Sequence, residues 1–238
     1  VLIVGANDWT TAFGVYLKDL GYPVTIADSS TFALRGPRRR DLNVYRGDIL
    51  DEVMQDHLDL GQFQQALVAS DNDAYNSLIC ADLGPEMGFE LMTQTAATET
   101  KRGGVSPRGR VLLDSKRTIE ELQRLHAEGW TFGRTRITEK FTFADYRDRL
   151  PDGGEPIAVR HEDGELEFFA ADHKPYVEED DVVISFLPPE PEHEKAARNE
   201  ARASEAKAAK DKAEAKAEAK AEAEEDTKNG GPKGQLPG

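Results

Sequence analysis

The sequence lacks most of the features on which several classes of protein depend. Its 238 residues include a single cysteine, Cys80, so no disulfide can form within the chain. No stretch approaches the roughly 18 apolar residues that span a bilayer, so we expect this stretch of chain to be soluble. Lys and Arg number 30 against 45 Asp and Glu. The net charge of −15 argues against nucleic acid or an anionic membrane as a partner, since both are polyanions.

The chain begins with the apolar run VLIV at residues 1–4, with no initiator methionine and no signal peptide before it. A start inside a predicted strand leads us to expect a segment of a longer polypeptide. The other end is of low complexity, because residues 190–238 contain repeats such as KAEAKAEAKAEA and no aromatic side chain. Like charges recur there at four-residue spacing, which predicts a marginally helical or disordered tail.

Residues 1–138 alternate short β-rich runs with amphipathic runs. The pattern predicts strands at 1–4, 24–27, 42–45, 65–70, 89–93 and 110–113, and helices at 9–20, 51–58, 73–83 and 118–127. A weak helical turn at 31–35 should break at Pro37, and Gly84 with Pro85 should end the helix at 73–83. This order predicts the α/β class, as a Rossmann-like parallel sheet with helices on both faces.

Residues 139–189 differ from the first region and predict a small, mostly antiparallel α+β module. FTFADYRDRL should form a short helix, and EPIAVRH and ELEFFAA read as strands. The Asp-Gly pair at 163–164 lies between these two runs and indicates a hairpin. The expected organisation is therefore 1–138, 139–189 and the tail at 190–238.

Gly5 and Asp28 mark the place where the sequence indicates a ligand. Gly5 follows a strand and precedes a helix, and Asp28 ends the second predicted strand. In a dinucleotide site, the amides at such a helix N-terminus face a pyrophosphate and such a carboxylate accepts hydrogen bonds from the ribose. A carboxylate at this point would repel a ribose 2′-phosphate, which favours NAD over NADP.

The glycine pattern of that turn is incomplete. The usual G-x-G-x-x-G would place glycine at 5, 7 and 10, but this sequence has Gly5, Asn7 and Thr10. Asn tolerates positive φ, so Asn7 could still make the tight turn, although its side chain crowds the approach of a pyrophosphate. Two interpretations stay open: a site that includes Asn7 and Thr10, or a Rossmann fold that has lost its nucleotide.

Polar residues also follow the third and fourth predicted strands. Asp48 comes after the third, and Ser70, Asp71 and Asn76 follow the fourth. In open α/β sheets, ligands bind outside the carboxyl ends of the strands, so we expect Gly5, Asp28, Asp48 and Ser70 to surround one crevice. The Ser-Asp-Asn run at 70–72 is equally typical of a helix cap.

Three stretches resemble the RCK family, also called KTN, of nucleotide-binding regulatory domains of potassium channels and cation transporters: VLIVGANDWTTAFGVYLKDLGYPVTIAD, NVYRGDILDEVMQ and QALVASDNDAYNSLICADLGPEMG. The family pattern is matched at Gly5, Asp28, Gly47, Asp48, Ser70, Asp71 and Asn76, and Asn7 and Thr10 depart from it. Residues 109–146 and the hairpin after them look like the C-terminal extension of some bacterial cation/proton antiporters.

The resemblance implies a regulatory domain with no catalysis of its own. It implies a crevice for NAD(H) or an adenine nucleotide (ATP, ADP or AMP), formed by Gly5, Asn7, Thr10, Asp28, Asp48, Ser70, Asp71 and Asn76. It implies a homodimer or higher RCK-type oligomer, joined to an N-terminal transmembrane transport domain. The place implied is the cytoplasmic face of the bacterial inner membrane.

Two other functions stay open on the residues alone. One is a fragment of an NAD-dependent oxidoreductase or epimerase, although no tyrosine has a lysine four positions later. The other is a degenerate Rossmann scaffold that acts in protein–protein contact. The histidines show no metal-ligand spacing, so no metal site is expected. His161 and His173 are either pH sensors or ordinary surface histidines.

Overall fold

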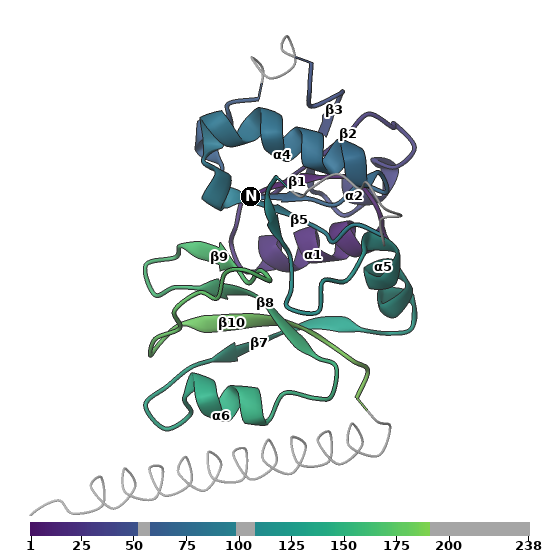
Figure 1. Ribbon diagram of the computed structural model, residues 1–238. Helices are drawn as coiled ribbons and strands as arrows, with labels where there is room; N and C mark the ends of the chain where they lie inside the picture. Colours follow the sequence, from purple (N-terminus) through teal and green to yellow (C-terminus); the bar gives the residue numbers. More distant parts are fainter. Residues whose placement is uncertain (52–57, 99–107, 191–238) are drawn as a thin grey trace, which may run out of the picture. The chain divides into compact units, whose positions relative to one another are not determined.

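A six-stranded parallel sheet forms one layer of the computed structural model, which describes residues 1–51, 58–98 and 108–190 (Figure 1). Its order β3-β2-β1-β4-β5-β6 is the order of a Rossmann fold. All neighbouring strands are parallel, as the apolar runs predicted. The strands are β1 (Leu2–Val4), β2 (Thr25–Asp28), β3 (Asn43–Arg46), β4 (Ala66–Val68), β5 (Met92–Gln94) and β6 (Arg110–Val111).

Helices cover both faces of this sheet, which confirms the predicted fold class. Trp9 and Phe13 of α1 (Asp8–Asp19) share one buried cluster with Leu122 of α5 (Ile119–Ala127). Ile79 and Leu83 of α4 (Asp73–Met87) pack in the cluster on the opposite face. The remaining helical segments of this half are α2 (Arg35–Arg39), η1 (Leu60–Gln62) and η2 (Phe89–Leu91).

Three boundaries predicted from proline, glycine and apolar patterns are wrong. Helix α4 does not end at Pro85 but continues to Met87, and Gly88 with φ of 102° follows it. Pro37 lies inside α2, in the first turn, where a missing N–H breaks no helical hydrogen bond. The strand expected at 89–93 starts only at Met92, because η2 precedes it. The helix expected at 51–58 and the tail lie outside the described residues.

A second, antiparallel sheet has the order β7-β10-β8-β9. Its strands are β7 (Thr131–Arg136), β8 (Glu155–Arg160), β9 (Leu166–Phe168) and β10 (Val182–Leu187), and α6 (Phe143–Asp148) packs on it through Tyr146. The predicted hairpin is present, with Gly164 at φ of 89° in its turn. Strand β7 was not predicted, and it places the start of this sheet ahead of residue 139.

Helix α1 lies between the two sheets and joins them into one hydrophobic core (Figure 1). Phe13 is fully buried, and its ring centroid lies 5.1 Å from that of Phe132 in β7 and 6.1 Å from that of Phe168 in β9. Trp9 meets Phe186 of β10 edge to face at 6.1 Å. Residues Val1–Pro189 form one compact unit, so the regions expected at 1–138 and 139–189 share their core.

Replacing Phe186 tests whether the two sheets unfold together. Phe186 is fully buried and contacts Trp9, Trp130 and Phe132. Phe186→Ala should therefore lower the free energy of unfolding by about 3–5 kcal/mol, in a single transition followed by urea titration and tryptophan fluorescence. Tyr176→Ala is the control, because its side chain is 78% exposed and its loss should stay within about 0.5 kcal/mol. Separate melting of the antiparallel sheet would contradict the shared core.

Candidate functional site

A crevice of about 220 Å³ opens at the carboxyl ends of the parallel strands. Four of the predicted site residues line it: Gly5, Asp28, Ser70 and Asp71. The other residues around it are Val4, Ala27, Ser29, Gly47, Ile49, Asn72 and Tyr75. The structure thus brings together the loops after β1, β2, β3 and β4 at one edge of the sheet. That these residues hold a ligand stays a prediction.

Gly5 allows the tight approach between the ends of β1 and β4. Its φ is 102°, and a Cβ at this position would lie 2.6 Å from the Ala69 carbonyl oxygen and 2.6 Å from the Ser70 nitrogen. Both neighbours are backbone atoms that cannot turn aside, so no other residue fits here. Asn7 has φ of −144°, so the expectation that Asn7 makes the turn is wrong, because Gly5 alone takes the positive angle.

Asn7 and Thr10, the two departures from the glycine pattern, form a capping box on α1. The Asn7 Oδ1 accepts a hydrogen bond from the Thr10 amide at 2.9 Å, and the Thr10 Oγ1 accepts one from the Asn7 amide at 2.9 Å. Thr10 Oγ1 also donates to the Gly5 carbonyl at 2.8 Å, and Asn7 Nδ2 donates to the Ala69 carbonyl at 3.1 Å. Neither residue lines the crevice, so their side chains stabilise the turn itself.

Asp28 closes the same turn from the end of β2. Its Oδ2 accepts from the Ala6 amide at 2.8 Å, and its Oδ1 accepts from the Ser30 amide at 2.7 Å. The amides of Ala6, Asn7 and Thr10 are therefore all bonded within the protein, although a phosphate would need such amides. Each carboxylate oxygen has a second lone pair, so Asp28 can still accept from ribose hydroxyls.

Asn76 holds the loop after β4 from behind instead of lining the crevice. It is fully buried, and its Oδ1 accepts from the Ser70 amide at 3.1 Å and from the Ser70 hydroxyl at 2.6 Å. Its Nδ2 donates to the Ser70 carbonyl at 3.0 Å. Asn72 caps α4 by accepting from the Tyr75 amide at 3.1 Å, which confirms the capping interpretation of this loop.

Tyr75 is a crevice residue that sequence reasoning missed. Its hydroxyl donates to Asp48 Oδ1 at 2.6 Å, and this hydrogen bond, followed by one from the Leu50 amide, lowers the pKa of Asp48. Burial and then Asp48 raise the pKa of Tyr75, so the tyrosine stays a donor. Asp48 is thereby linked to the crevice through Tyr75, although it does not line it. The available signal was a tyrosine in the first turn of the helix after β4.

The crevice is rich in hydrogen-bond acceptors, and among the described residues no lysine, arginine or histidine lines it. The arginines of α2 are not among the residues that line the crevice, and the Arg35 guanidinium lies 5.2 Å from the centre of the Phe32 ring. Cys80 is fully buried, and burial raises the pKa of its thiol to about 12. In the described ranges, no three His, Cys, Asp or Glu side chains are grouped to hold a metal ion.

No protein-family model matches the chain, and no curated protein matches it significantly. Among the solved structures that match is the crystal structure of the GsuK RCK domain, with 16% sequence identity and a TM-score of 0.37. The match covers 83% of this chain, which spans 45% of the length of that one. The Rossmann-like fold of this chain follows from its own strand order. Of the residues described here, none belongs to a helix long and apolar enough to cross a bilayer.

Gly5→Ala should cost more stability than Gly21→Ala, although both glycines have positive φ. A Cβ at Gly21, with φ of 95°, would meet nothing within 4 Å, so Gly21→Ala should cost only the about 1–2 kcal/mol of a left-handed alanine. Gly5→Ala adds the contact with Ala69 and Ser70 and should lose at least twice as much in urea unfolding. Equal losses in the two variants would contradict a tight β1–β4 approach.

Proposed function

We propose that this chain is a regulatory domain of the RCK type, which binds a nucleotide in the crevice and controls a membrane cation transporter such as a cation/proton antiporter. The observation that carries the proposal is the meeting of Gly5, Asp28, Ser70 and Asp71 at one crevice. These residues occupy positions of the RCK pattern, which the sequence resembles over three separate stretches. The domain would lie at the cytoplasmic face of the bacterial inner membrane, behind an N-terminal transport domain.

The chemistry of the crevice favours the nucleoside end of the ligand. Asp28 and Asp71 offer carboxylate oxygens to hydroxyl groups, whereas the amides of Ala6, Asn7 and Thr10 are already bonded. A phosphate gains its affinity from free amides and from cations, and the described lining provides no cation. We therefore propose that an adenine nucleotide or NAD(H) binds through its ribose and base, with little contribution from its phosphates.

Regulation follows if the ligand prefers one conformation of a domain pair. A ligand shifts an equilibrium only by its difference in affinity for the two states, so a homodimer with two arrangements would transmit occupancy to the transport domain. The crevice supports binding in preference to catalysis, since its described lining contains neither a nucleophilic cysteine nor a histidine base. The tyrosine–lysine pair expected of an NAD-dependent oxidoreductase or epimerase is also missing from the sequence.

A second candidate function is a Rossmann scaffold that contacts another protein without any nucleotide. The closed turn favours it, because Asn7 and Thr10 satisfy in the free protein the groups that a pyrophosphate would bind. The two candidates differ in one measurable respect, namely whether a nucleoside binds at Asp28.

Calorimetry with adenosine, AMP, ATP, NAD and NADH tests the binding proposal. Adenosine, AMP and ATP should bind with affinities within a few fold of one another, since the described lining has no cation for the phosphates and the amides of Ala6, Asn7 and Thr10 are already bonded. Asp28→Asn should weaken binding by about tenfold, because a neutral amide replaces the charged acceptor. Asp152→Asn, a change at an exposed turn outside the crevice, should leave the affinity unchanged.

Each alternative result has its own meaning. No heat with any of the five compounds would overturn the nucleotide proposal in favour of the scaffold. A steep gain in affinity from adenosine to ATP would overturn the proposed role of the ribose. Equal affinity of Asp28→Asn and the unchanged protein would remove Asp28 from the site.

The transport part of the proposal has a separate test in the gene. The sequence encoded upstream of Val1 should contain about a dozen apolar segments of roughly 20 residues each, the length that spans a bilayer. An upstream region without such segments would contradict the transporter context and leave the nucleotide proposal standing.

A further inference from the structure

The second sheet carries a chain of imidazole and carboxylate groups that the proposed nucleotide site does not use. His161 Nδ1 lies 3.0 Å from Asp181 Oδ2, and His161 Nε2 lies 3.6 Å from Glu167 Oε2. The other oxygen of Glu167 lies 2.5 Å from His173 Nε2. Two imidazoles therefore alternate with two carboxylates in one unbroken series.

This series crosses three neighbouring strands at the point where their ladder ends. His161 directly follows β8, Glu167 lies in β9, and Asp181 directly precedes β10. The last backbone pairs nearby are Arg160 with Leu166 and Arg160 with Val182. The side chains thus connect the ends of β8, β9 and β10, where the backbone pairing between these strands stops.

Each ring nitrogen of His161 faces a carboxylate, and both nitrogens are donors only when the ring carries two protons. The Asp181 side chain is 3% exposed, and its Oδ2 accepts from the Glu178 amide at 2.8 Å as well as facing His161. A buried carboxylate needs donors, so the Nδ1 of His161 has to carry a proton. A neutral His161 would then turn the lone pair of its Nε2 towards Glu167. The doubly protonated ring donates to Asp181 and places its second N–H in an ionic contact with Glu167, 3.6 Å away.

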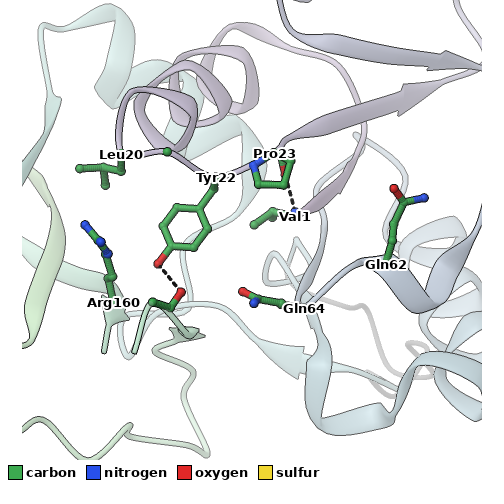
Figure 2. A pocket seen from close by; sticks show the side chains of 9 residues that line it. Val1, Leu20, Tyr22, Pro23, Gln62, Gln64 and Arg160 are labelled. Carbon is green, nitrogen blue, oxygen red and sulfur yellow. Dashed lines mark hydrogen bonds between the residues drawn. The ribbon is translucent and has the colours of Figure 1, made fainter. Parts of the chain in front are cut away.

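Other charged groups lie near this series. The segment before β10 brings Glu178, Glu179 and Asp180 to this end of the sheet, and the hairpin turn adds Glu165. Arg136 of β7 is engaged with Asp180 at 2.8 Å. Arg160 lines a separate cavity with Tyr22 (Figure 2). Acidic residues therefore predominate in the segments next to this end of the second sheet.

The hairpin that this series holds also contacts the parallel half of the molecule. The Tyr22 hydroxyl, in the loop between α1 and β2, donates to the Gly164 carbonyl at 3.0 Å (Figure 2). Burial raises the pKa of Tyr22 to about 12, so this hydroxyl keeps its proton at neutral pH. The turn is closed by the His161 amide on the Glu165 carbonyl and by the Gly164 amide on the His161 carbonyl.

We propose that Asp181, His161, Glu167 and His173 form a proton-dependent clamp, which holds the β8–β9 hairpin to the start of β10 at acidic pH and loosens at alkaline pH. Imidazole gives up its second proton between about pH 5 and 8, whereas the carboxylates stay ionised through that range. The stabilisation is therefore present at the acidic end of the range and is lost as the pH rises. This inference does not depend on nucleotide binding.

Hydrogen exchange of the whole 238-residue chain tests the clamp. The amides of His161 and Gly164 report on opening of the hairpin, and their protection factors, corrected for the intrinsic effect of pH, should fall about tenfold between pH 6 and pH 8. His161→Gln keeps a donor for Asp181 but cannot titrate, so the pH response of the Gly164 protection factor should shrink to the part that His173 supplies. His126→Gln is the control, since His126 faces the Trp130 carbonyl at 3.0 Å and should keep the wild-type response.

Imidazole nitrogen NMR of the unchanged protein gives a second reading that needs no variant. His161 should carry protons on both nitrogens at pH 6 and keep only the Nδ1 proton at pH 8. Protection factors that do not change with pH in the wild type would overturn the clamp. A pH response of the same size in His161→Gln, or an unprotonated Nδ1 at pH 8, would also overturn it.

Discussion

The burial of α1 between two sheets is the constraint on which the rest of the structure depends. On one side of the helix, Gly14 fits against Ile26 and Val24 of the parallel half, and on the other side Phe13 packs on Phe132 of the antiparallel sheet. A helix covered on both sides cannot slide without opening one core. The N-terminus of α1, which begins beside the crevice, is therefore held in place by residues more than a hundred positions later in the chain.

Carboxylates perform two different tasks in this acidic protein. At the crevice, Asp28 accepts hydrogen bonds from two backbone amides and has further lone pairs that a hydroxyl-bearing ligand can use. At the end of the second sheet, Asp181 and Glu167 face the imidazole nitrogens of His161 and His173, which are donors only when they carry a proton. In both places the negative charge faces converging donors, as a partly buried carboxylate requires.

Local patterns predicted much of the parallel half because β1 and β4 are short apolar runs and because α1, α4 and α5 begin at recognisable caps. Thr118 and Glu121, for example, form the capping box that starts α5. Strand β7 escaped prediction because Arg134 and Arg136 interrupt its apolar pattern, and only pairing with β10 makes it a strand. Helix α4 passes its expected end at Pro85, and Met87 in its last turn packs against the buried cluster on this face of the sheet.

By itself, the sequence determined the order of strands and helices, the glycine turn at Gly5 and the carboxylate that ends β2, since these follow from periodicity and spacing over a few residues. Only the tertiary structure decided what the polar side chains contact. Asn7 bonds the carbonyl of Ala69, Tyr75 bonds Asp48, and His161 faces Asp181. Each of these contacts joins segments far apart in the chain, and their distances depend on sheet order and packing, which no local pattern encodes.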